Sequence, residues 1–205
     1  MANSNKIIAW DFDGVLNRNV ENGVFKWSRH FERDLGLSHD SFVEYLFLGR
    51  FQQAMVGKAN LKHMVSEWLT QHDTHHTAAD ILDYWFKTDD IPDHDTLAIV
   101  ETMRQRGHAH IMATNNEAIR TNYIEHDMGF GGIMDHIFAA GRMGVMKPDI
   151  AYFRHIEDAL NAPADRFLFV DDMAENIDAA HSAGWHAFHF TNGAHQALND
   201  WLDTH

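Results

Sequence analysis

The segment "IIAWDFDGVLNRN", residues 7–19, decides how the rest of the chain is interpreted. A short apolar run ends in two carboxylates, Asp11 and Asp13, and a glycine follows directly. Aspartate and glycine are ordinary turn residues, so the pattern taken alone favours a turn. The same pattern also suits a metal-assisted phosphoryl-transfer site at the end of a buried strand. The other motifs of the chain have to separate the two interpretations.

Composition limits the class of protein. The chain has 205 residues, 45% of them hydrophobic and 12% aromatic, which excludes global disorder and is enough for one large domain or a core with an insertion. No apolar run has the length of a membrane span, and "MANSNK" at the start has no secretory pattern, so we expect a cytoplasmic protein. The formal charge of −14 argues against broad binding to nucleic acid or anionic membranes. An acidic protein that handles an anionic substrate needs a cation or fixed donors, which points toward a divalent metal.

Cysteine is absent from the sequence, which removes disulfides, thiol nucleophiles and thiolate metal sites together. The 17 histidines are scattered, and "HDTHH" (His72, His75 and His76) is the one dense group. Partner carboxylates at a matching spacing are missing there, so we expect a solvated helix end rather than a zinc site.

Five short stretches are predicted to be buried strands. Helical patterns over 95–107, 149–161 and 174–184 lie between the later ones. Strands that alternate with helices of this length predict an α/β fold, with a Rossmann-like parallel sheet covered by helices on both faces. The predicted strands are 7–11, 108–114, 136–140, 167–171 and 185–190.

The stretch after the first strand breaks this rhythm. It contains four amphipathic helical segments (27–37, 39–57, 60–72 and 78–87) and no convincing strand. We therefore predict a catalytic core of residues 1–16 and 93–205, with a helical cap of residues 17–92 inserted into it. The aromatic residues expected to form the small core of the cap are Trp27, Phe31, Phe42, Tyr45, Trp68, Tyr84, Trp85 and Phe86.

Polar residues follow several of the predicted strands. Ligands of parallel sheets gather outside the carboxyl ends of the strands, so these residues are expected to meet at one edge. Each pattern alone also suits a turn, a helix cap or an acidic helix start, but their joint placement favours a common site. The residues are Asp11, Asp13, Thr114, Asn115, Lys147, Asp171 and Asp172.

Together these residues meet the demands of phosphoryl transfer, which are an in-line nucleophile, charge neutralisation and a proton donor for the leaving oxygen. Asp11 is suited to act as the nucleophile and Asp13 as the acid and base. Mg²⁺ suits Asp11, the backbone carbonyl of Asp13 and a carboxylate from Asp171 and Asp172, because it prefers oxygen ligands.

Three further residues complete the predicted site. Lys147 adds positive charge opposite the metal and keeps the crowded carboxylates ionised, because like charges alone would raise their pKa values. The hydroxyl of Thr114 and the amide of Asn115 are placed to hold the remaining phosphate oxygens at a helix amino end.

In this arrangement the chain resembles the haloacid dehalogenase superfamily of aspartate-nucleophile phosphohydrolases. Four motifs occur in the family's order: "DFDGVL" from Asp11, Thr114 in "MATNN", Lys147 in "VMKPD" and "FVDDMAEN" around Asp171. The resemblance covers about residues 6–190. The insertion looks like the helical cap of subfamily I members, and "LGRFQQAMVGKANLKHMVSEWL" is similar to sugar-phosphate phosphatases of the glucose-1-phosphatase type.

The resemblance implies a role for each matched residue. Asp11 would be the nucleophile and Asp13 the acid and base. Thr114 would bind phosphate and Lys147 would stabilise the charges. Asp172 would be the second carboxylate on Mg²⁺.

Other roles are implied less directly by the same motifs. Asp171 would support the metal through water, and Asn176 would orient the acidic loop. Outside these motifs, we take Arg50, Gln53 and Lys58 of the cap as candidates for contacts with the substrate, with surface charges that have no substrate role as the alternative. Relatives often have an acidic residue where this chain has Lys58.

Alternatives within the superfamily differ in what they need. Dehalogenases lack the second aspartate of the first motif, so Asp13 disfavours dehalogenation. A phosphonatase needs a cap amine, and none of the available lysines has a recognisable context (Lys26, Lys58, Lys62 and Lys87). A phosphomutase uses the same core residues and stays open, as does a non-catalytic protein that binds a phosphorylated ligand. We predict a Mg²⁺-dependent phosphatase of a small phosphorylated metabolite such as a sugar phosphate, acting as a monomer or homodimer.

Overall fold

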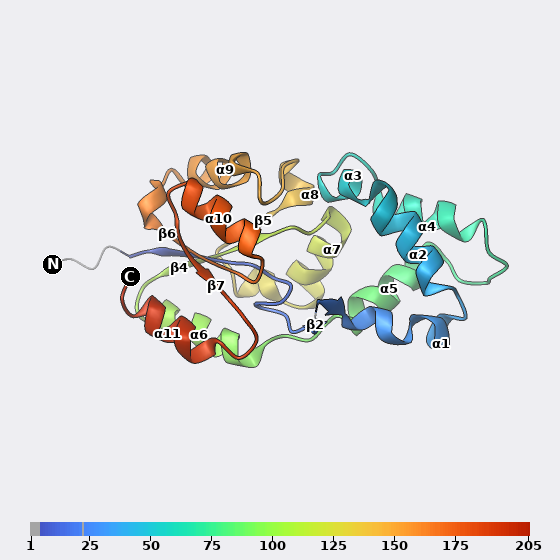
Figure 1. Cartoon of the computed structure of the whole chain (residues 1–205), viewed down its shortest axis with the longest axis horizontal. Helices are drawn as coiled ribbons and strands as arrows, with labels where there is room; N and C mark the ends of the chain where they lie inside the picture. Colours follow the sequence, from blue (N-terminus) through green and yellow to red (C-terminus); the bar gives the residue numbers. More distant parts are fainter. Residues whose placement is uncertain (1–4, 22) are drawn as a thin grey trace.

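A five-stranded parallel sheet forms the centre of the molecule, in the order β5-β4-β1-β6-β7 (Figure 1). The computed structural model describes residues 5–21 and 23–205. All five predicted strands are confirmed, and their ends move by no more than one residue. The strands are β1 (Ile7–Trp10), β4 (Ala109–Thr114), β5 (His136–Ala139), β6 (Phe167–Asp171) and β7 (His186–His189).

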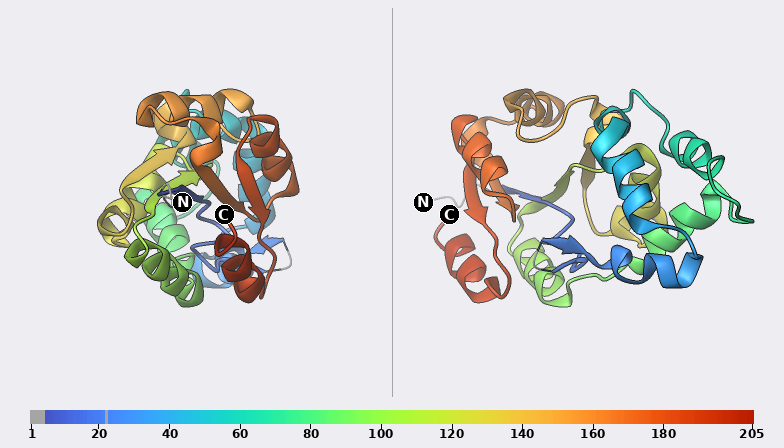
Figure 2. Two further views of the ribbon diagram at one scale, coloured as in Figure 1. Left: turned by 90° about the vertical axis from the view of Figure 1, so that its left-hand side faces the viewer. Right: turned by 45° about the vertical axis from the view of Figure 1, so that its right-hand side comes forward.

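Helices cover both faces of this sheet, as predicted (Figures 1 and 2). Alternate residues of β1 point to opposite faces, so Ile8 and Trp10 join one hydrophobic cluster while Ile7 and Ala9 join another. A strand that is buried on both faces has an apolar run rather than an alternating pattern, which explains the sequence of β1. The first cluster includes α6 (His94–Gln105) and α11 (His195–Leu202), and the second includes α9 (Ile150–Leu160) and α10 (Ala174–Ser182).

Several short helical elements connect the strands and were not predicted. Each has three to five residues, which is too short to show a helical period in the sequence. They are α7 (Ala118–Asn122), η3 (Tyr123–Asp127), η4 (Phe130–Gly132), α8 (Ala140–Met143) and η5 (Ala164–Arg166).

The inserted helices gather at the end of the molecule opposite the carboxyl terminus and have a hydrophobic cluster of their own (Figure 1). The ring centroid of Trp27 lies 5.7 Å from that of Phe31, 5.8 Å from that of Phe42 and 5.3 Å from that of Trp85. This confirms the predicted aromatic core. We call this region the helical part; it comprises η1 (Lys26–His30), α1 (Phe31–Leu35), α2 (His39–Tyr45), η2 (Leu46–Arg50), α3 (Phe51–Met55), α4 (Leu61–Leu69) and α5 (Ala78–Thr88).

Two expectations for the insertion are wrong. The helical segment over 39–57 is not continuous, because Gly49 has non-helical angles (φ −94°, ψ −112°) that break it. A strand pair is also present, since β2 (Val20–Glu21) runs antiparallel to β3 (Val24–Phe25). Strands of two residues are too short to show alternation in the sequence.

Hydrogen bonds hold the two chain crossings into and out of the insertion beside each other. The Asn17 side chain donates to the carbonyl of Asp89 (2.6 Å) and accepts from the N–H of Ile91 (2.9 Å). The N–H of Asp93 donates to the carbonyl of Leu16 (2.9 Å). The exact boundaries at residues 16/17 and 92/93 stay a prediction.

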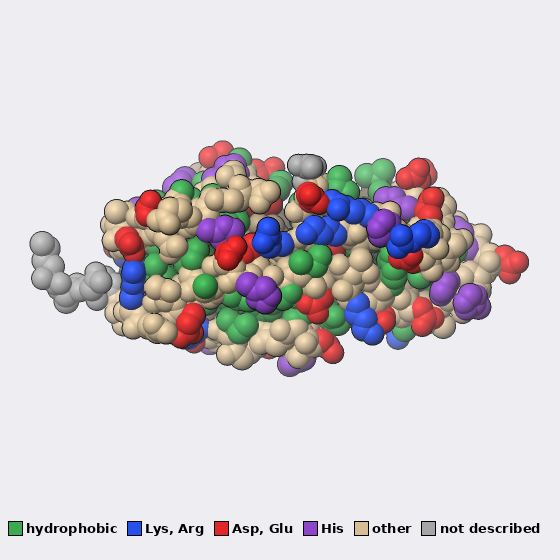
Figure 3. Space-filling view, turned by 90° about the horizontal axis from the view of Figure 1, so that it is seen from below, with side chains coloured by type: hydrophobic (Ala, Val, Ile, Leu, Met, Phe, Trp, Pro, Cys, Tyr) green, Lys and Arg blue, Asp and Glu red, His purple; other side chains and the backbone are tan. Residues whose placement is uncertain are grey.

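The face of the molecule seen in Figure 3 carries charged side chains of both signs, with histidines among them. In the "HDTHH" group, His72 donates to the carbonyl of Trp68 and His76 to that of Leu35. Across residues 5–21 and 23–205, no helix has both the length and the apolar character of a membrane span.

Replacing Phe153 by alanine tests the packing under α9. Its ring is fully buried and stands edge-on to Phe169 (5.6 Å) and Trp185 (5.1 Å). We expect the unfolding free energy to fall by about 3–5 kcal/mol, because a large cavity remains. The control Leu48→Ala, at a side chain 78% exposed, should change it by less than about 0.5 kcal/mol. Chemical denaturation measures both, and equal effects would contradict the packing.

Candidate active site

Three carboxylates meet at the carboxyl ends of β1 and β6. Asp11 follows β1, Asp171 ends β6 and Asp172 is the next residue. The parallel register pairs Trp10 with Val170, which brings these acids together. One carboxylate oxygen from each of the three lies within 4.8 Å of the others. The predicted convergence of distant segments is therefore present.

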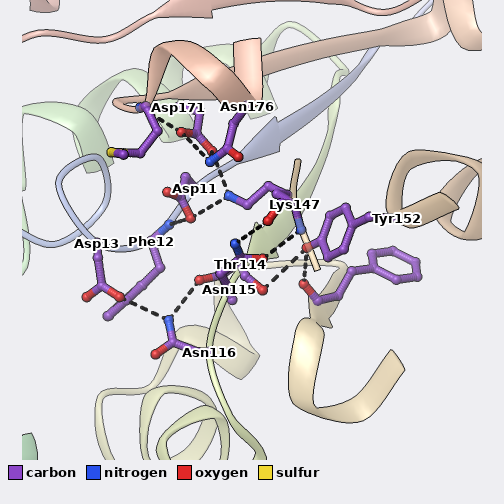
Figure 4. Close-up of polar contacts among 12 residues, drawn as sticks. Asp11, Phe12, Asp13, Thr114, Asn115, Asn116, Lys147, Tyr152, Asp171 and Asn176 are labelled. Carbon is purple, nitrogen blue, oxygen red and sulfur yellow. Dashed lines mark hydrogen bonds and ion pairs between the residues drawn. The ribbon is translucent and has the colours of Figure 1, made fainter. Parts of the chain in front are cut away.

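A buried lysine lies between two of these acids (Figure 4). The Nζ of Lys147 is 2.9 Å from Oδ1 of Asp11 and 2.6 Å from Oδ2 of Asp171. The side chain of Asn115 accepts from the N–H of Lys147 and donates to its carbonyl, both at 2.9 Å. The Asn115 side chain thus fixes the backbone of the lysine, rather than pointing a free amide at a phosphate.

The electrostatics of this group are dominated by burial. Burial raises the pKa of Asp11 well above its usual range; Lys147 opposes the shift, and the acids at 171 and 172 add to it. Burial alone would lower the pKa of Lys147, but the nearby charges of Asp11 and Asp171 outweigh it and raise this pKa. Burial, followed by the charge of Asp171, raises the pKa of Asp172 to about 6. Three acids face one amine, so a bound cation would lower the pKa values of Asp11 and Asp172.

This donor set fits Mg²⁺. Hard carboxylate oxygens with surplus negative charge are the ligands that this ion prefers. Gly14, which has φ +82°, explains how Asp172 approaches the turn after β1, because a Cβ there would lie 2.4 Å from its Oδ2. The glycine of "DFDG" is thus required by the close approach of the acidic loop.

Asp171 is already saturated by donors. The Nδ2 of Asn176 lies 3.0 and 3.1 Å from its two oxygens, and the N–H of Met173 donates to Oδ1 at 2.8 Å. With Lys147 also on Oδ2, this carboxylate has little capacity left for a metal. The arrangement favours Asp172 as the direct ligand and gives Asn176 the orienting position that the resemblance implied.

Asp13 occupies a separate polar network. Its Oδ1 accepts from Nη2 of Arg120 and from Nδ2 of Asn19, both at 2.7 Å. Its Oδ2 accepts from Nδ2 of Asn116 at 3.1 Å (Figure 4). Asn116 also donates to the Thr114 hydroxyl at 2.8 Å, which links the two predicted site residues. Arg120, Asn19 and Asn116 were not predicted from the sequence.

Buried groups behind Thr114 and Asp13 extend this network. The hydroxyl of Tyr152 donates to the carbonyls of Phe138 (2.7 Å) and Thr114 (3.4 Å). Arg120 also lies 3.5 Å from Asp89, which accepts from Asn19 as well.

The helix that follows this loop is capped differently from the expectation. We expected Thr114 and Asn115 at a helix amino end, but α7 begins at Ala118 and Glu117 is its cap. The Glu117 carboxylate accepts the N–H groups of Ile119 and Arg120. An acidic cap satisfies free amides as well as an amide or hydroxyl cap does, and nothing in the sequence separated the two.

The candidate residues of the insertion are not joined to this site. Arg50 pairs with Glu67 at 2.5 Å on the exposed surface of the helical part. Lys58 lines a different cavity of about 310 Å³, beside Glu117 and Gly141. Gln53 is exposed.

A second group of potential ligands consists of Asp93, Asp95 and His195, of which Asp93 and His195 line the same cleft as Gly14 and Asp172. The Oδ1 of Asp93 accepts the N–H groups of Asp95 and Thr96, and Arg18 lies 3.5 Å from its Oδ2. Asp93 therefore serves as the cap of α6, which accounts for this cluster.

Comparison with known proteins identifies the family. The family model described as haloacid dehalogenase-like hydrolase matches residues 5–184. The chain belongs to the haloacid dehalogenase-like hydrolases. Over 106 residues it is 30% identical to a sesquiterpene phosphatase of Aspergillus oryzae, covering 49% of this chain and 52% of that protein. The match thus spans about half the length of this curated relative.

Solved structures share the fold of this haloacid dehalogenase-like chain. A protein of Porphyromonas gingivalis described as a predicted HAD-like family hydrolase has a TM-score of 0.78 at 18% identity, covering 97% of this chain and 98% of that one. A HAD family enzyme of Bacteroides thetaiotaomicron, in complex with magnesium and inorganic phosphate, has a TM-score of 0.73 at 14% identity, with 92% and 96% covered. At these identities the likeness concerns the fold.

The buried Asp89 gives a pH-dependent test of the network around Asp13. Burial raises its pKa from 3.8 to about 6, against the opposing charge of Arg120. Its contribution to stability is therefore complete below about pH 4 and is lost as the pH rises through 6. We expect the difference in unfolding free energy between pH 4 and pH 7 to become smaller by up to about 3 kcal/mol in Asp89→Asn.

Chemical denaturation at the two pH values measures this difference, whatever constant offset the substitution adds. The matched control is Asp83→Asn in α5, the helix that Asp89 follows, where the carboxylate is 55% exposed. An unchanged pH dependence in Asp89→Asn would contradict the raised pKa.

Proposed function

We propose that this haloacid dehalogenase-like hydrolase is a Mg²⁺-dependent phosphatase that cleaves a small phosphomonoester through an aspartyl-phosphate on Asp11. The observation that supports it most is the buried contact of Lys147 with Asp11 and Asp171, with Asp172 alongside. The related protein of A. oryzae is named a phosphatase, and the B. thetaiotaomicron enzyme was solved with magnesium and phosphate, which supports the same chemistry here.

Mg²⁺ would be held by the Asp11 carboxylate, the backbone carbonyl of Asp13 and the Asp172 carboxylate, with Asp171 supporting it through water. When bound, the ion neutralises negative charge on the phosphate and on the carboxylates around it. Thr114, through its hydroxyl, and Asn115, through its backbone N–H, would hold other phosphate oxygens, because the Asn115 side chain is engaged with Lys147.

In the first half-reaction an oxygen of Asp11 forms a bond to phosphorus while the bond from phosphorus to the leaving oxygen breaks. Asp13 gives its proton to that leaving oxygen, and an alcohol departs. Lys147 and the N–H of Phe12, both on Oδ1 of Asp11, hold the carboxylate in one orientation for the attack.

In the second half-reaction Asp13 takes a proton from water, and the water oxygen attacks the phosphorus of the aspartyl-phosphate. The bond to Asp11 breaks, which restores the carboxylate and releases inorganic phosphate. Arg120, Asn19 and Asn116 are positioning residues in this scheme, because each donates a hydrogen bond to the Asp13 side chain.

The presence of a held acid favours a phosphoester over a halide. An alkoxide leaving group needs a proton, whereas a halide leaves without one. Asp13, fixed by three side-chain donors, would have no task in dehalogenation.

Replacing Asp11 by asparagine tests the nucleophile. We expect Mg²⁺-dependent hydrolysis of p-nitrophenyl phosphate to fall by at least about 10³-fold, because an amide does not form the acyl-phosphate bond. The exposed Asp158→Asn on α9 is the matched control and should keep full turnover. Circular dichroism checks that both variants fold. Turnover of Asp11→Asn at the wild-type rate would refute the mechanism.

Metal binding is testable without turnover. We expect Mg²⁺ to raise the melting temperature more at pH 7.5 than at pH 5, because Asp172, with its pKa of about 6, is largely protonated at the lower pH. Asp172→Asn and Gly14→Ala should both lose most of the gain, since the second places a Cβ 2.4 Å from the Asp172 carboxylate. The same gain in all three proteins would exclude this metal site.

A further inference from the structure

An apolar cavity of about 160 Å³ lies between the strand ends and the helical part. We call it the aromatic cavity. One wall comes from the core and includes Asp13, Asn116 and Arg120. The opposite wall consists of Phe25, Trp27, Phe47, Phe51, Met55 and Trp85.

The aromatic wall is held in place by its own ring contacts. Phe47 lies 4.6 Å from Phe51, 5.4 Å from Trp85 and 5.8 Å from Trp27, measured between ring centroids. Trp27 and Trp85 are each only 3% exposed. The wall is therefore preformed, and a ligand does not have to order it.

Hydrogen-bonding groups around the cavity are mostly engaged already. Asp13 is held by Arg120 and by two asparagine side chains, one of which, Asn116, also donates to Thr114. Among the described residues of the aromatic wall, only the indole N–H groups of Trp27 and Trp85 are side-chain donors, and that of Trp85 has no partner. A sugar with several hydroxyl groups would lose its water here without replacement partners, which is costly.

The cavity adjoins the proposed acid. Asp13, which would protonate the leaving oxygen, lines it, so the group attached to that oxygen would enter this space. A second, more polar cleft of about 320 Å³ includes Gly14, Asp172 and Arg18, without Asp13 in its lining. The side chain of the proposed acid thus lines the aromatic cavity and not the cleft that Asp172 lines.

The volume of the aromatic cavity limits the size of the leaving group that it can hold. An apolar cavity of about 150 Å³ in another protein is known to bind benzene, so about 160 Å³ suits a benzene-sized group. Phe25, which is 37% exposed, and its neighbour Val24, 49% exposed, keep the nearby surface apolar.

We propose that the substrate is a phosphomonoester of an apolar alcohol, with a ring or short branched chain of about the size of benzene seated in the aromatic cavity, rather than a sugar phosphate. This inference rests on the proposed phosphatase function. It differs from the sugar phosphate that the resemblance of the cap segment implied. The cap residues expected to contact the substrate, Arg50, Gln53 and Lys58, do not line the cavity.

The test compares kcat/KM for benzyl phosphate, glucose 1-phosphate and acetyl phosphate, all with Mg²⁺. Acetyl phosphate is small and reports the phosphoryl-transfer step without filling the cavity. We expect benzyl phosphate to exceed glucose 1-phosphate by about 10²-fold, as burial of one ring predicts. Benzylphosphonate should likewise inhibit acetyl phosphate hydrolysis at a concentration at least about 10-fold lower than methylphosphonate does.

Substitutions in the aromatic wall locate the effect. Phe51→Asn should lower the ratio of kcat/KM for benzyl phosphate to that for acetyl phosphate by about 10-fold, and Phe51→Leu should restore most of it, since an apolar side chain returns. Leu48→Asn is the control, because Leu48 is 78% exposed on the same segment and does not line the cavity. It should change neither rate.

The outcomes separate the two proposals. Hydrolysis of acetyl phosphate with equal or better use of glucose 1-phosphate overturns the substrate class and leaves the phosphatase function standing. An unchanged ratio in Phe51→Asn overturns the cavity as the binding site. Absence of Mg²⁺-dependent hydrolysis of all three compounds overturns the phosphatase function, and the substrate class falls with it.

Discussion

The contact of one buried ammonium with two carboxylates is the constraint on which the site depends. Lys147 is 1% exposed and bridges Asp11 and Asp171, which come from the ends of two different strands. Removing the ammonium, or removing both carboxylates, would leave an uncompensated charge in the interior, which is strongly destabilising. The same contact therefore joins three loops of the fold and sets the position of the proposed nucleophile. Asn115 contributes by fixing the lysine backbone.

A second buried cation organises the other carboxylate of the first motif. Arg120 lies 2.7 Å from Asp13 and 3.5 Å from Asp89, and Asn19 bonds to both acids. Two aspartates only two residues apart are thus assigned to different surroundings, one beside Lys147 and one beside Arg120. Separate surroundings suit separate roles as nucleophile and proton carrier. Because Asp89 follows α5, this network also connects the proposed acid to the chain that leaves the helical part.

The sequence predicted the features that depend on residues close together in the chain, such as the strands and the acids that follow them. The apolar runs that end in Asp11 and Asp171 located the strands, and the rule for parallel sheets then brought their acids together. Arg120, Asn19 and Asn116 escaped prediction because their roles arise from contacts between distant segments, such as the 107 positions that separate Arg120 from Asp13. The hairpin β2–β3 and the break at Gly49 were not predicted, because each involves too few residues to change the hydrophobic pattern of the sequence. The aromatic residues were correctly assigned to a helical core, but the sequence did not reveal that some of them also face the strand ends.

The double role of those aromatic rings links packing to chemistry. Trp27 and Trp85 belong to the buried cluster of the helical part, and the same rings line the space beside Asp13. Binding is favourable when an apolar group displaces water from a cavity with apolar walls. Because Asp13 lines the same cavity, this binding energy is available next to the reacting atoms. An apolar alcohol seated there would also exclude water from Asp13 and Arg120, which strengthens their electrostatic interaction as the local dielectric falls. The aromatic rings that pack the helical part would then both select the substrate and exclude water from the residue that transfers the proton.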